Sequence, residues 1–205
     1  MTEKCETLTD MELVEQVKIG DRKAYSTLVR RHQKALFRLC LRFMKDTASA
    51  EDVVQEAFIK AYERLSSFEA RASFKSWLFQ IAVNTAKNKL RERRDTTDIN
   101  DVQLSVAAMA ETTLVQGSIA DVLHAFVDEL PPRQKTALVL RVYEDLSFKE
   151  IAEIMECPYD TAKANYRHAL MKLKTDLEEH SELHRWTDEV GGFVMEMTRR
   201  VAEAD

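Results

Sequence analysis

The chain has 205 residues with only four glycines and three prolines, and its apolar residues recur at helical rather than strand spacing, so we expect an all-α fold. No segment approaches the ~20 consecutive apolar residues of a membrane span, and the amino terminus lacks an apolar leader, which favours a cytoplasmic protein. Three widely separated cysteines indicate reduced thiols, not a disulfide framework or a zinc site.

Charge divides the chain into alternating segments. The overall net charge is −5, yet residues 1–95 carry +5 and residues 133–175 carry +2, whereas residues 96–132 and 176–205 each carry −6. An uneven distribution of this kind allows nucleic-acid binding by the basic parts. We therefore expect two small helical domains, at 1–95 and 119–175, joined by a flexible acidic linker at 96–118 and followed by an acidic amphipathic helical extension at 176–205.

The first domain is predicted to contain four helices. Thr9 or Asp10 caps the first helix, which ends at Gly20, and the second helix follows Asp21 and runs through Phe43. Residues 46–50 interrupt the pattern, and the capping spacing predicts that Ser49 begins the third helix. This third helix is predicted to continue to Leu65. A loop at 66–73 follows it, and the fourth helix runs from Phe74 to about Arg94.

The fourth helix is apolar at its beginning and basic at its end. Asn84 and Asn88 lie four residues apart and share a helix face near Lys87, an arrangement suited to polar contacts with bases and phosphates. The cationic side chains expected to meet phosphates, and to make binding depend on salt, are Lys87, Lys89, Arg91, Arg93 and Arg94.

The second domain is predicted to end in a helix-turn-helix. Pro131 and Pro132 stop one helix, and Ser147 with Glu150 has the spacing of a capping box that opens the next. A turn at 156–158 leads into a longer helix, whose outward side chains can reach base edges and phosphates. These outward residues are Thr161, Lys163, Ala164, Asn165, Arg167 and His168. A solvated helical hairpin without DNA contact is the alternative for this pattern alone.

Several stretches together resemble the sigma-70 family of RNA polymerase subunits. AEDVVQEAFIKAYERL at 50–65 and SFKSWLFQIAVNTAKNKLRERR at 73–94 look like conserved regions 2.2 to 2.4, and residues 128–174 resemble region 4. The lack of an intervening third domain is typical of the extracytoplasmic-function (ECF) group, and the sequences of these motifs most resemble the envelope-stress factors of the sigma-E type. The resemblance covers about 165 residues and implies a transcription initiation factor, not an enzyme.

For the first domain, the resemblance implies that Asp52, Gln55 and Glu56 dock on the β′ clamp helices of core RNA polymerase. These polar groups share one face of a helix whose other face is apolar, although an ordinary solvated face is the alternative. Asn84 and Asn88 would contact the promoter minus-10 element. The loop at 66–73 would capture a flipped base, with Phe68 as its aromatic platform or, equally, as a core residue.

For the second domain, the resemblance implies binding to the β flap and reading of the minus-35 element by Arg141 and the second helix of the helix-turn-helix. The chain departs from the family at Ala162, Ala164 and Asn165, where Val, Ser and Arg are usual, so its preferred promoter sequence cannot be copied from a relative. Glu156 also stands where the turn commonly has Gly. The acidic linker would either mimic RNA in the exit path or serve as a plain spacer.

Two hypotheses concern regulation and two concern rival functions. We expect control by an anti-sigma factor or by the chain's own extension at 176–205, whose apolar stripe needs a partner. A stand-alone helix-turn-helix regulator would leave the polar face of the third helix unexplained. A helical enzyme lacks support, because the sequence shows no phosphate loop, no metal-ligand set and no cofactor motif; we predict neither catalytic residues nor metal nor cofactor.

Overall fold

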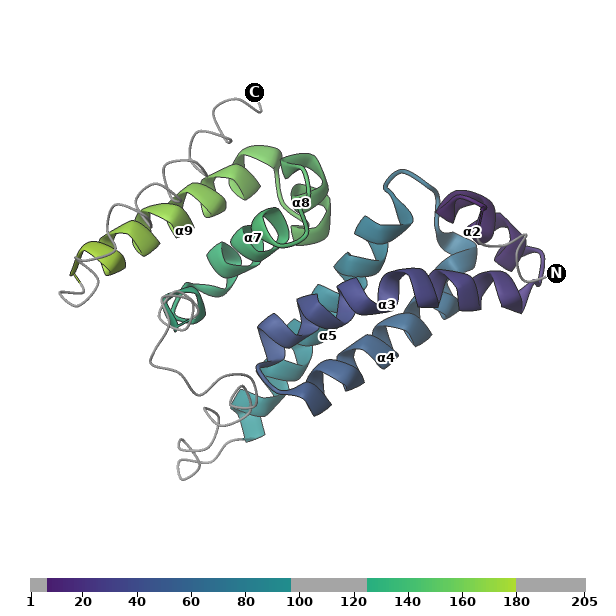
Figure 1. Ribbon diagram of the computed structural model, residues 1–205, viewed down its shortest axis with the longest axis horizontal. Helices are drawn as coiled ribbons and strands as arrows, with labels where there is room; N and C mark the ends of the chain where they lie inside the picture. Colours follow the sequence, from purple (N-terminus) through teal and green to yellow (C-terminus); the bar gives the residue numbers. More distant parts are fainter. Residues whose placement is uncertain (1–6, 97–124, 180–205) are drawn as a thin grey trace. The chain divides into compact units, whose positions relative to one another are not determined.

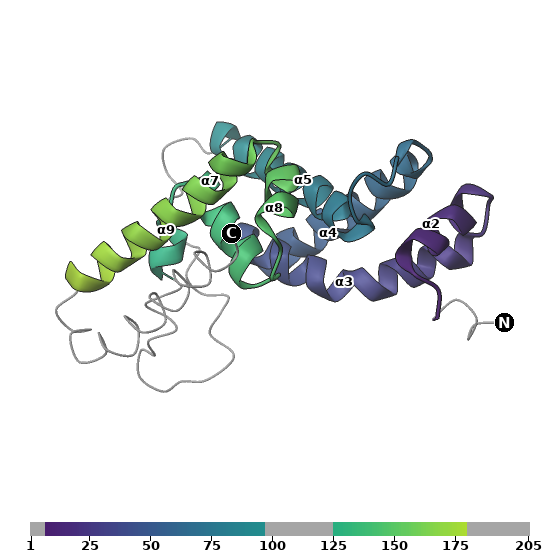
Figure 2. The same ribbon diagram turned by 90° about the horizontal axis from the view of Figure 1, so that it is seen from above.

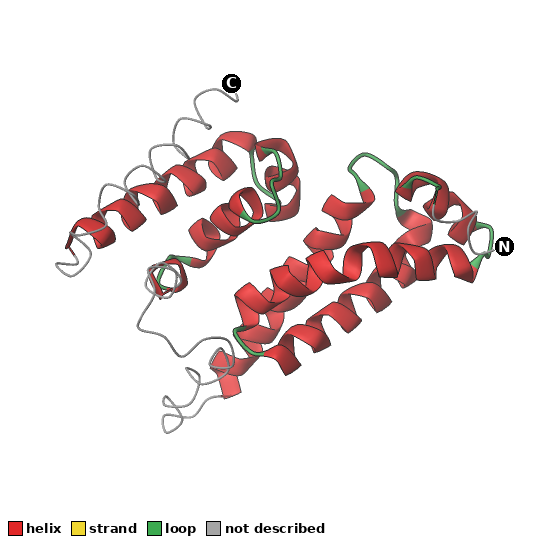
Figure 3. Ribbon diagram, viewed as in Figure 1, coloured by secondary structure: helices red, strands yellow, loops and turns green. Residues whose placement is uncertain are grey.

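The computed structural model describes residues 7–96 and 125–179, which belong to two compact units, Met1–Leu114 and Val115–Asp205 (Figure 1). Within these described ranges all regular secondary structure is helical (Figure 3), which confirms the all-α prediction. Most of the predicted linker and nearly all of the predicted C-terminal extension lie outside the described residues.

The first two helices of unit 1 begin where polar caps were expected. Thr9 caps α2 (Asp10–Lys18) and forms a capping box with Glu12, which satisfies backbone N–H groups that the first turn leaves without helical partners. Gly20 then turns the chain with a φ of 101°, a conformation that suits a residue without a side chain. Asp21 caps α3 (Arg22–Met44) by accepting a hydrogen bond from the Lys23 N–H.

The start of the third helix differs from the prediction, because α4 (Thr47–Arg64) begins two residues before Ser49. Lys45 adopts a left-handed conformation that ends α3, and its N–H donates to the Leu41 carbonyl. The next residue, Asp46, caps α4 by accepting from the Ser49 N–H at 2.7 Å. The break therefore needs only Lys45 and Asp46, and Ser49 lies buried in the first turn of the helix.

Unit 1 is built from α3, α4 and α5 (Phe74–Thr96), which pack against one another (Figure 1). The short 3-10 helix η1 (Leu65–Ser67) follows α4, and α2 contacts both α3 and η1, so it lies at the end of the unit that carries the 66–73 loop (Figure 2). The core is formed by apolar side chains that are almost fully buried: Leu28, Leu36, Leu39, Val53, Ala57, Leu78, Phe79 and Val83.

Unit 2 contains α7 (Pro132–Val142), α8 (Phe148–Met155) and α9 (Tyr159–Glu179). Residues 125–128 are also helical and precede Pro131, whereas the earlier part of that predicted helix lies outside the described residues. The small core is formed by residues from all three helices, of which Leu140, Ile151, Ile154 and Tyr166 are at most 1% exposed. Helix α9 runs past the predicted end at residue 175.

The turn between α8 and α9 has the predicted helix-turn-helix form. Ser147 and Glu150 form the capping box that opens α8, as expected. At the other end Glu156 takes a left-handed φ of 51°, and the Cys157 N–H donates to the Ala152 carbonyl at 3.0 Å. This geometry explains why related turns favour Gly at this position, since a Cβ is strained in a left-handed conformation.

Candidate nucleic-acid interfaces

The polar end of α5 presents the side chains predicted to contact bases. Lys87 and Asn88 are exposed, and Asn84 is half-buried one turn earlier. Buried neighbours such as Val83 and Ala86 fix the opposite face of the helix against the core. The helix therefore offers amide and ammonium groups on one side while its other side is held rigidly, which suits polar contacts with nucleic acid.

Two of the basic residues on α5 turn toward α4. The Lys89 ammonium lies 3.7 Å from an Asp52 carboxylate oxygen and 3.6 Å from a Glu56 carboxylate oxygen. Arg93 pairs with Asp46 at 3.2 Å and donates to the Ser49 hydroxyl. Although burial raises the pKa of Asp46, hydrogen bonds from Ser49 and Arg93 hold it below its usual range. Lys89 and Arg93 are thus paired with carboxylates at α4 in this structure, and phosphate contacts by the basic stretch remain a prediction.

The exposed face of α4 carries the three predicted docking residues. Asp52 and Gln55 are exposed, and the Glu56 carboxylate accepts a hydrogen bond from Lys60 that lowers its pKa below the usual range. Ile59 is 59% exposed, and it lies on this same face because positions 52, 55, 56 and 59 follow helical spacing. The sequence reasoning did not single it out. The sequence did contain a signal for this exposure, since Ile59 is an apolar residue that lies outside the apolar stripe of the helix.

The loop at 66–73 buries its aromatic residue. Phe68 is 5% exposed, and its ring centroid lies 4.9 Å from that of Trp77 and 6.2 Å from that of Phe74. The structure therefore favours the core alternative for Phe68 over a platform for a flipped base. The residues on either side of it, at 66–67 and 69–71, are exposed and form the accessible surface of the loop.

The second helix of the helix-turn-helix, α9, presents its predicted face outward. Arg167 and His168 are exposed, and the earlier positions Thr161, Lys163 and Ala164 are half-buried. The intervening Ala162, Tyr166 and Ala169 are buried, as the helical periodicity requires. Asn165 is also half-buried, and its amide donates to the Thr161 carbonyl at 2.8 Å, so the residue that replaces the usual Arg is engaged within its own helix.

Arg141 has a structural position that the sequence did not reveal. Its guanidinium donates to the Leu146 carbonyl at 2.9 Å and lies 5.3 Å from the centre of the Phe148 ring. Only 20% of its side chain is exposed. Arg141 therefore fastens the connection between α7 and α8, and its contact with the minus-35 element remains a prediction.

Two absences apply to residues 7–96 and 125–179. No three His, Cys, Asp or Glu side chains there are grouped closely enough to hold a metal ion. The helices in those same ranges are also too short or too polar to cross a bilayer.

Comparison with known proteins identifies the family. Residues 28–96 match the family model for Sigma-70 region 2, and residues 120–173 match that for Sigma-70 region 4. The RNA polymerase sigma-H factor of Pseudomonas aeruginosa is 37% identical over 167 residues, which is 76% of this chain and 86% of the relative. The ECF RNA polymerase sigma-E factor of Escherichia coli K12 is 37% identical over 171 residues, 78% of this chain and 89% of the relative.

The chain belongs to the sigma-70 family, in its ECF group. Its two units carry regions 2 and 4 of that family, whose members are transcription initiation factors that bind core RNA polymerase and promoter DNA.

Solved structures agree on the fold. A sigma factor RpoE in complex with the anti-sigma factor NepR from Bartonella quintana aligns with a TM-score of 0.64 at 24% identity, over 77% of this chain and 98% of that chain. CnrH in complex with the cytosolic domain of CnrY aligns with a TM-score of 0.63 at 23% identity, over 84% and 99%. At these identities the likeness bears on the sigma fold alone.

Proposed function

We propose that this ECF sigma factor divides promoter recognition between its units: α4 docks on the β′ clamp helices of core polymerase, α5 and the 66–73 loop read the minus-10 element, and α9 reads the minus-35 element. The carrying observation is that regions 2 and 4 occur in this order in one chain, each with an outward polar helix face on a buried core. Catalysis by this chain is not part of the proposal.

The docking surface on α4 is supported by its chemistry. Asp52, Gln55 and Glu56 lie on the same helix face as the exposed Ile59, so a partner would meet carboxylates next to an apolar side chain. Interfaces commonly combine an apolar centre with a charged rim that favours approach of an oppositely charged partner. We expect Glu56→Lys to abolish holoenzyme formation, measured by gel filtration with core polymerase. Glu129→Lys, which reverses an exposed carboxylate of unit 2, is the control; normal assembly of Glu56→Lys would place the docking face elsewhere.

The minus-10 assignment rests on the amides of α5. We expect Asn84→Ala with Asn88→Ala to slow promoter opening at least about tenfold, because two polar base contacts of about 1 kcal/mol or more each are lost. Polymerase binding should be unchanged. Permanganate reactivity of melted thymines measures opening, and Gln16→Ala with Gln33→Ala removes two exposed amides elsewhere in unit 1 as the control. Equal melting by the Asn variant would refute the assignment.

The minus-35 assignment rests on the outward face of α9. Lys163→Ala with Arg167→Ala should remove the upstream part of the DNase I footprint while leaving the contacts near the start site. Lys174→Ala is the matched control, since its side chain is 64% exposed on the same helix but lies beyond the helix-turn-helix. An unaltered upstream footprint in the double variant would exclude this face.

A stand-alone DNA-binding regulator is the competing function. Filter binding of a promoter fragment with and without core polymerase separates the two, because a sigma factor of this kind should bind specifically only as holoenzyme. Specific binding by the chain alone at the same affinity would favour the regulator.

Regulation through a bound protein or through the chain's own tail completes the proposed function. The Bartonella quintana relative of known structure is a sigma factor in complex with an anti-sigma factor, and we propose a cytoplasmic factor under similar control or under control by its own residues 176–205. Deletion of 180–205, which keeps the whole of α9 with its buried Leu177, should raise promoter output if the extension restrains a sigma domain. Unchanged output and stability would leave an external anti-sigma factor as the regulator.

A further inference from the structure

The 66–73 loop of unit 1 is tied to a helix fifty residues earlier in the chain. The Lys18 ammonium, in the last turn of α2, donates to the Phe68 carbonyl at 3.1 Å in a part-buried contact. The same ammonium pairs with the Glu15 carboxylate at 2.9 Å. The ammonium therefore joins α2 to the loop while it is also paired with a carboxylate one turn earlier on its own helix.

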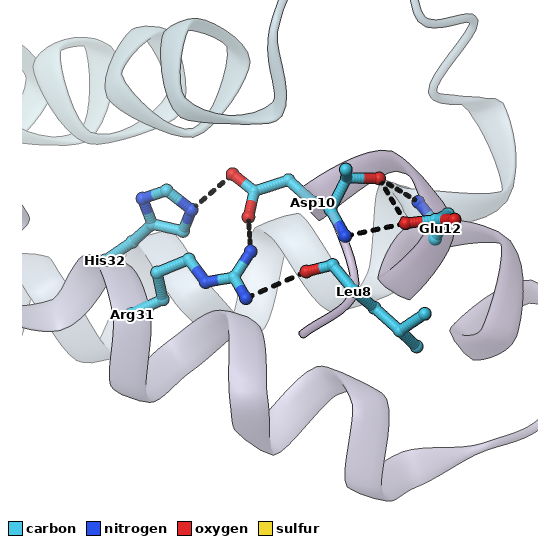
Figure 4. Close-up of polar contacts among 6 residues, drawn as sticks. Leu8, Asp10, Glu12, Arg31 and His32 are labelled. Carbon is cyan, nitrogen blue, oxygen red and sulfur yellow. Dashed lines mark hydrogen bonds and ion pairs between the residues drawn. The ribbon is translucent and has the colours of Figure 1, made fainter. Parts of the chain in front are cut away.

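Helix α2 is a firm support for that contact. Leu13 and Val14 are fully buried, and the Asp10 carboxylate is held between Arg31 and His32 of α3 (Figure 4). The His32 ring in turn lies 5.5 Å from that of Phe74, at the start of α5. Helix α2 is therefore fixed both to α3 and, through His32, to the residue that follows the loop.

The loop itself is held in a strained shape. Ala70 has a φ of 58°, in the left-handed region that costs a residue with a Cβ about 1 kcal/mol. Such a conformation persists only where the surroundings impose it. The imposing contacts are the buried Phe68 ring, the Lys18 hydrogen bond to the Phe68 backbone, and the Ser73 hydroxyl that accepts from the Ser76 N–H at 3.0 Å.

We propose that Lys18 is a positioning residue for promoter recognition: its hydrogen bond to the Phe68 carbonyl preorganises the 66–73 loop for a base flipped out of the minus-10 element. This inference rests on the proposed role of the loop. The exposed loop residues, not the buried Phe68 ring, then present the polar groups that meet the base. A loop already in its binding shape loses less conformational entropy on binding than one that must first be ordered.

The test measures base capture separately from stability. Holoenzyme formed with the full chain is titrated with nontemplate-strand oligonucleotides in which each minus-10 position in turn is abasic. For the wild type we expect base removal to weaken binding about tenfold at the position that the loop captures, the size of effect that loss of one well-held base gives, apart from any positions read by Asn84 and Asn88 of α5, which the Asn84→Ala with Asn88→Ala variant identifies. Lys18→Met should reduce that ratio to near one, Lys18→Arg should retain it, and Lys23→Met, which removes an exposed ammonium at the start of α3, should leave it unchanged.

Each outcome decides a different point. A Lys18→Met holoenzyme with the wild-type ratio overturns the inference about Lys18 but leaves the loop assignment intact. A wild type with no sensitive position beyond those read by α5 shows that the loop captures no base, and overturns both. Should Lys18→Met fold poorly, Lys18→Gln, whose side chain is shorter than that of lysine and uncharged, gives the same comparison; a lower melting temperature with an unchanged ratio would assign Lys18 a structural role only.

Discussion

The two units differ in how charged side chains join their longest helices. In unit 1, charged side chains bridge separate helices, as where Asp10 binds Arg31 and His32, or where Arg93 binds Asp46. In unit 2, Lys135 of α7 pairs with Asp128 of the helical segment 125–128, but the ion pairs of the long helix α9, such as Lys172 with Asp176, lie within that helix. The mutual position of α8 and α9 depends instead on buried rings and on the left-handed turn at Glu156.

This difference bears on function. The charges that connect α4 and α5 in unit 1 include Asp52, Glu56 and Lys89, which are also residues of the proposed polymerase and promoter surfaces. A partner that binds those carboxylates therefore acts on groups that also contact the neighbouring helix. In unit 2 the outward face of α9 is separate from the buried face that fixes the helix, so its surface can change without changing the fold.

The largest expected effect tests whether unit 2 is stabilised by a hydrophobic core that is independent of unit 1. Tyr166 is 1% exposed, and its ring packs against Phe148 at 5.5 Å. Tyr166→Ala should cost about 4 kcal/mol, as for other large aromatic truncations in cores, and so unfold a small unit. Peptide-resolved hydrogen exchange should show loss of protection in α7, α8 and α9 with protection of α3 to α5 retained. Met171→Ala, on the same helix but 67% exposed, is the control.

The next effect tests the polar bridge in unit 1. The hydrogen bond from His32 lowers the pKa of Asp10, against burial that raises it, and Arg31 lowers it further. Asp10→Asn should therefore cost about 1.5 kcal/mol at neutral pH, allowing for partial exposure of the pair. Because the folded-state pKa is lowered, the wild type has this stability above the ordinary carboxyl pKa and loses it as pH falls through the folded value.

Urea unfolding of both proteins between pH 7 and pH 2 measures the difference, which should shrink toward acid pH. Asp145→Asn is the control, since the Asp145 side chain is 99% exposed in unit 2. A difference that stays constant with pH would mean that the Asp10 carboxylate is not the stabilising species.

Much of the fold was predictable from local patterns. The polar cap at Thr9 or Asp10, the capping box at Ser147 and the helical spacing of apolar residues placed these helix starts and the core faces correctly, because such features depend on neighbours three or four residues away. The error at Ser49 arose because two polar residues, Asp46 and Ser49, were both able to cap. The left-handed turn at Lys45, which decides between them, has no composition signal in a residue other than Gly or Asn.

The site was predictable only in part. Helical spacing identified which residues of α4, α5 and α9 face outward, but it gave no indication of contacts between elements. The Arg141 bond to the Leu146 carbonyl, the Lys89 pairing across to α4 and the burial of the Phe68 ring all depend on tertiary packing. Long side chains such as Lys and Arg reach several partners from one position, so their sequence number does not determine their role.

A smaller effect, of opposite sign, tests the turn in unit 2. Glu156→Gly should stabilise unit 2 by about 1 kcal/mol, because Gly adopts the left-handed conformation without a Cβ penalty. Thermal unfolding followed by calorimetry should show this as a rise of about 4 to 8 °C in the transition of a small unit. Glu156→Ala removes the carboxylate but keeps the Cβ, so it should give no such rise; equal gains from both substitutions would assign the effect to charge.

The smallest expected change in stability concerns Lys89. The experiment distinguishes an ion pair that stabilises the fold from an ammonium that becomes available to bind a DNA phosphate. Its ammonium lies 3.6 and 3.7 Å from two partly exposed carboxylates, so Lys89→Gln should alter the free energy of unfolding by less than about 0.5 kcal/mol. If Lys89 leaves those carboxylates for a phosphate in the holoenzyme, the substitution should reduce the slope of log binding constant against log salt by about one.

Promoter binding by holoenzyme at several salt concentrations measures that slope, with Lys34→Gln on the exposed face of α3 as the control. An unchanged slope with a large loss of stability would show that Lys89 serves the α4 and α5 contact alone. A reduced slope with unchanged stability would mean that Lys89 binds DNA in the holoenzyme. In the free chain the same ammonium is paired with Asp52 and Glu56, the carboxylates proposed to dock on the polymerase, so it must leave them before its charge is available to DNA.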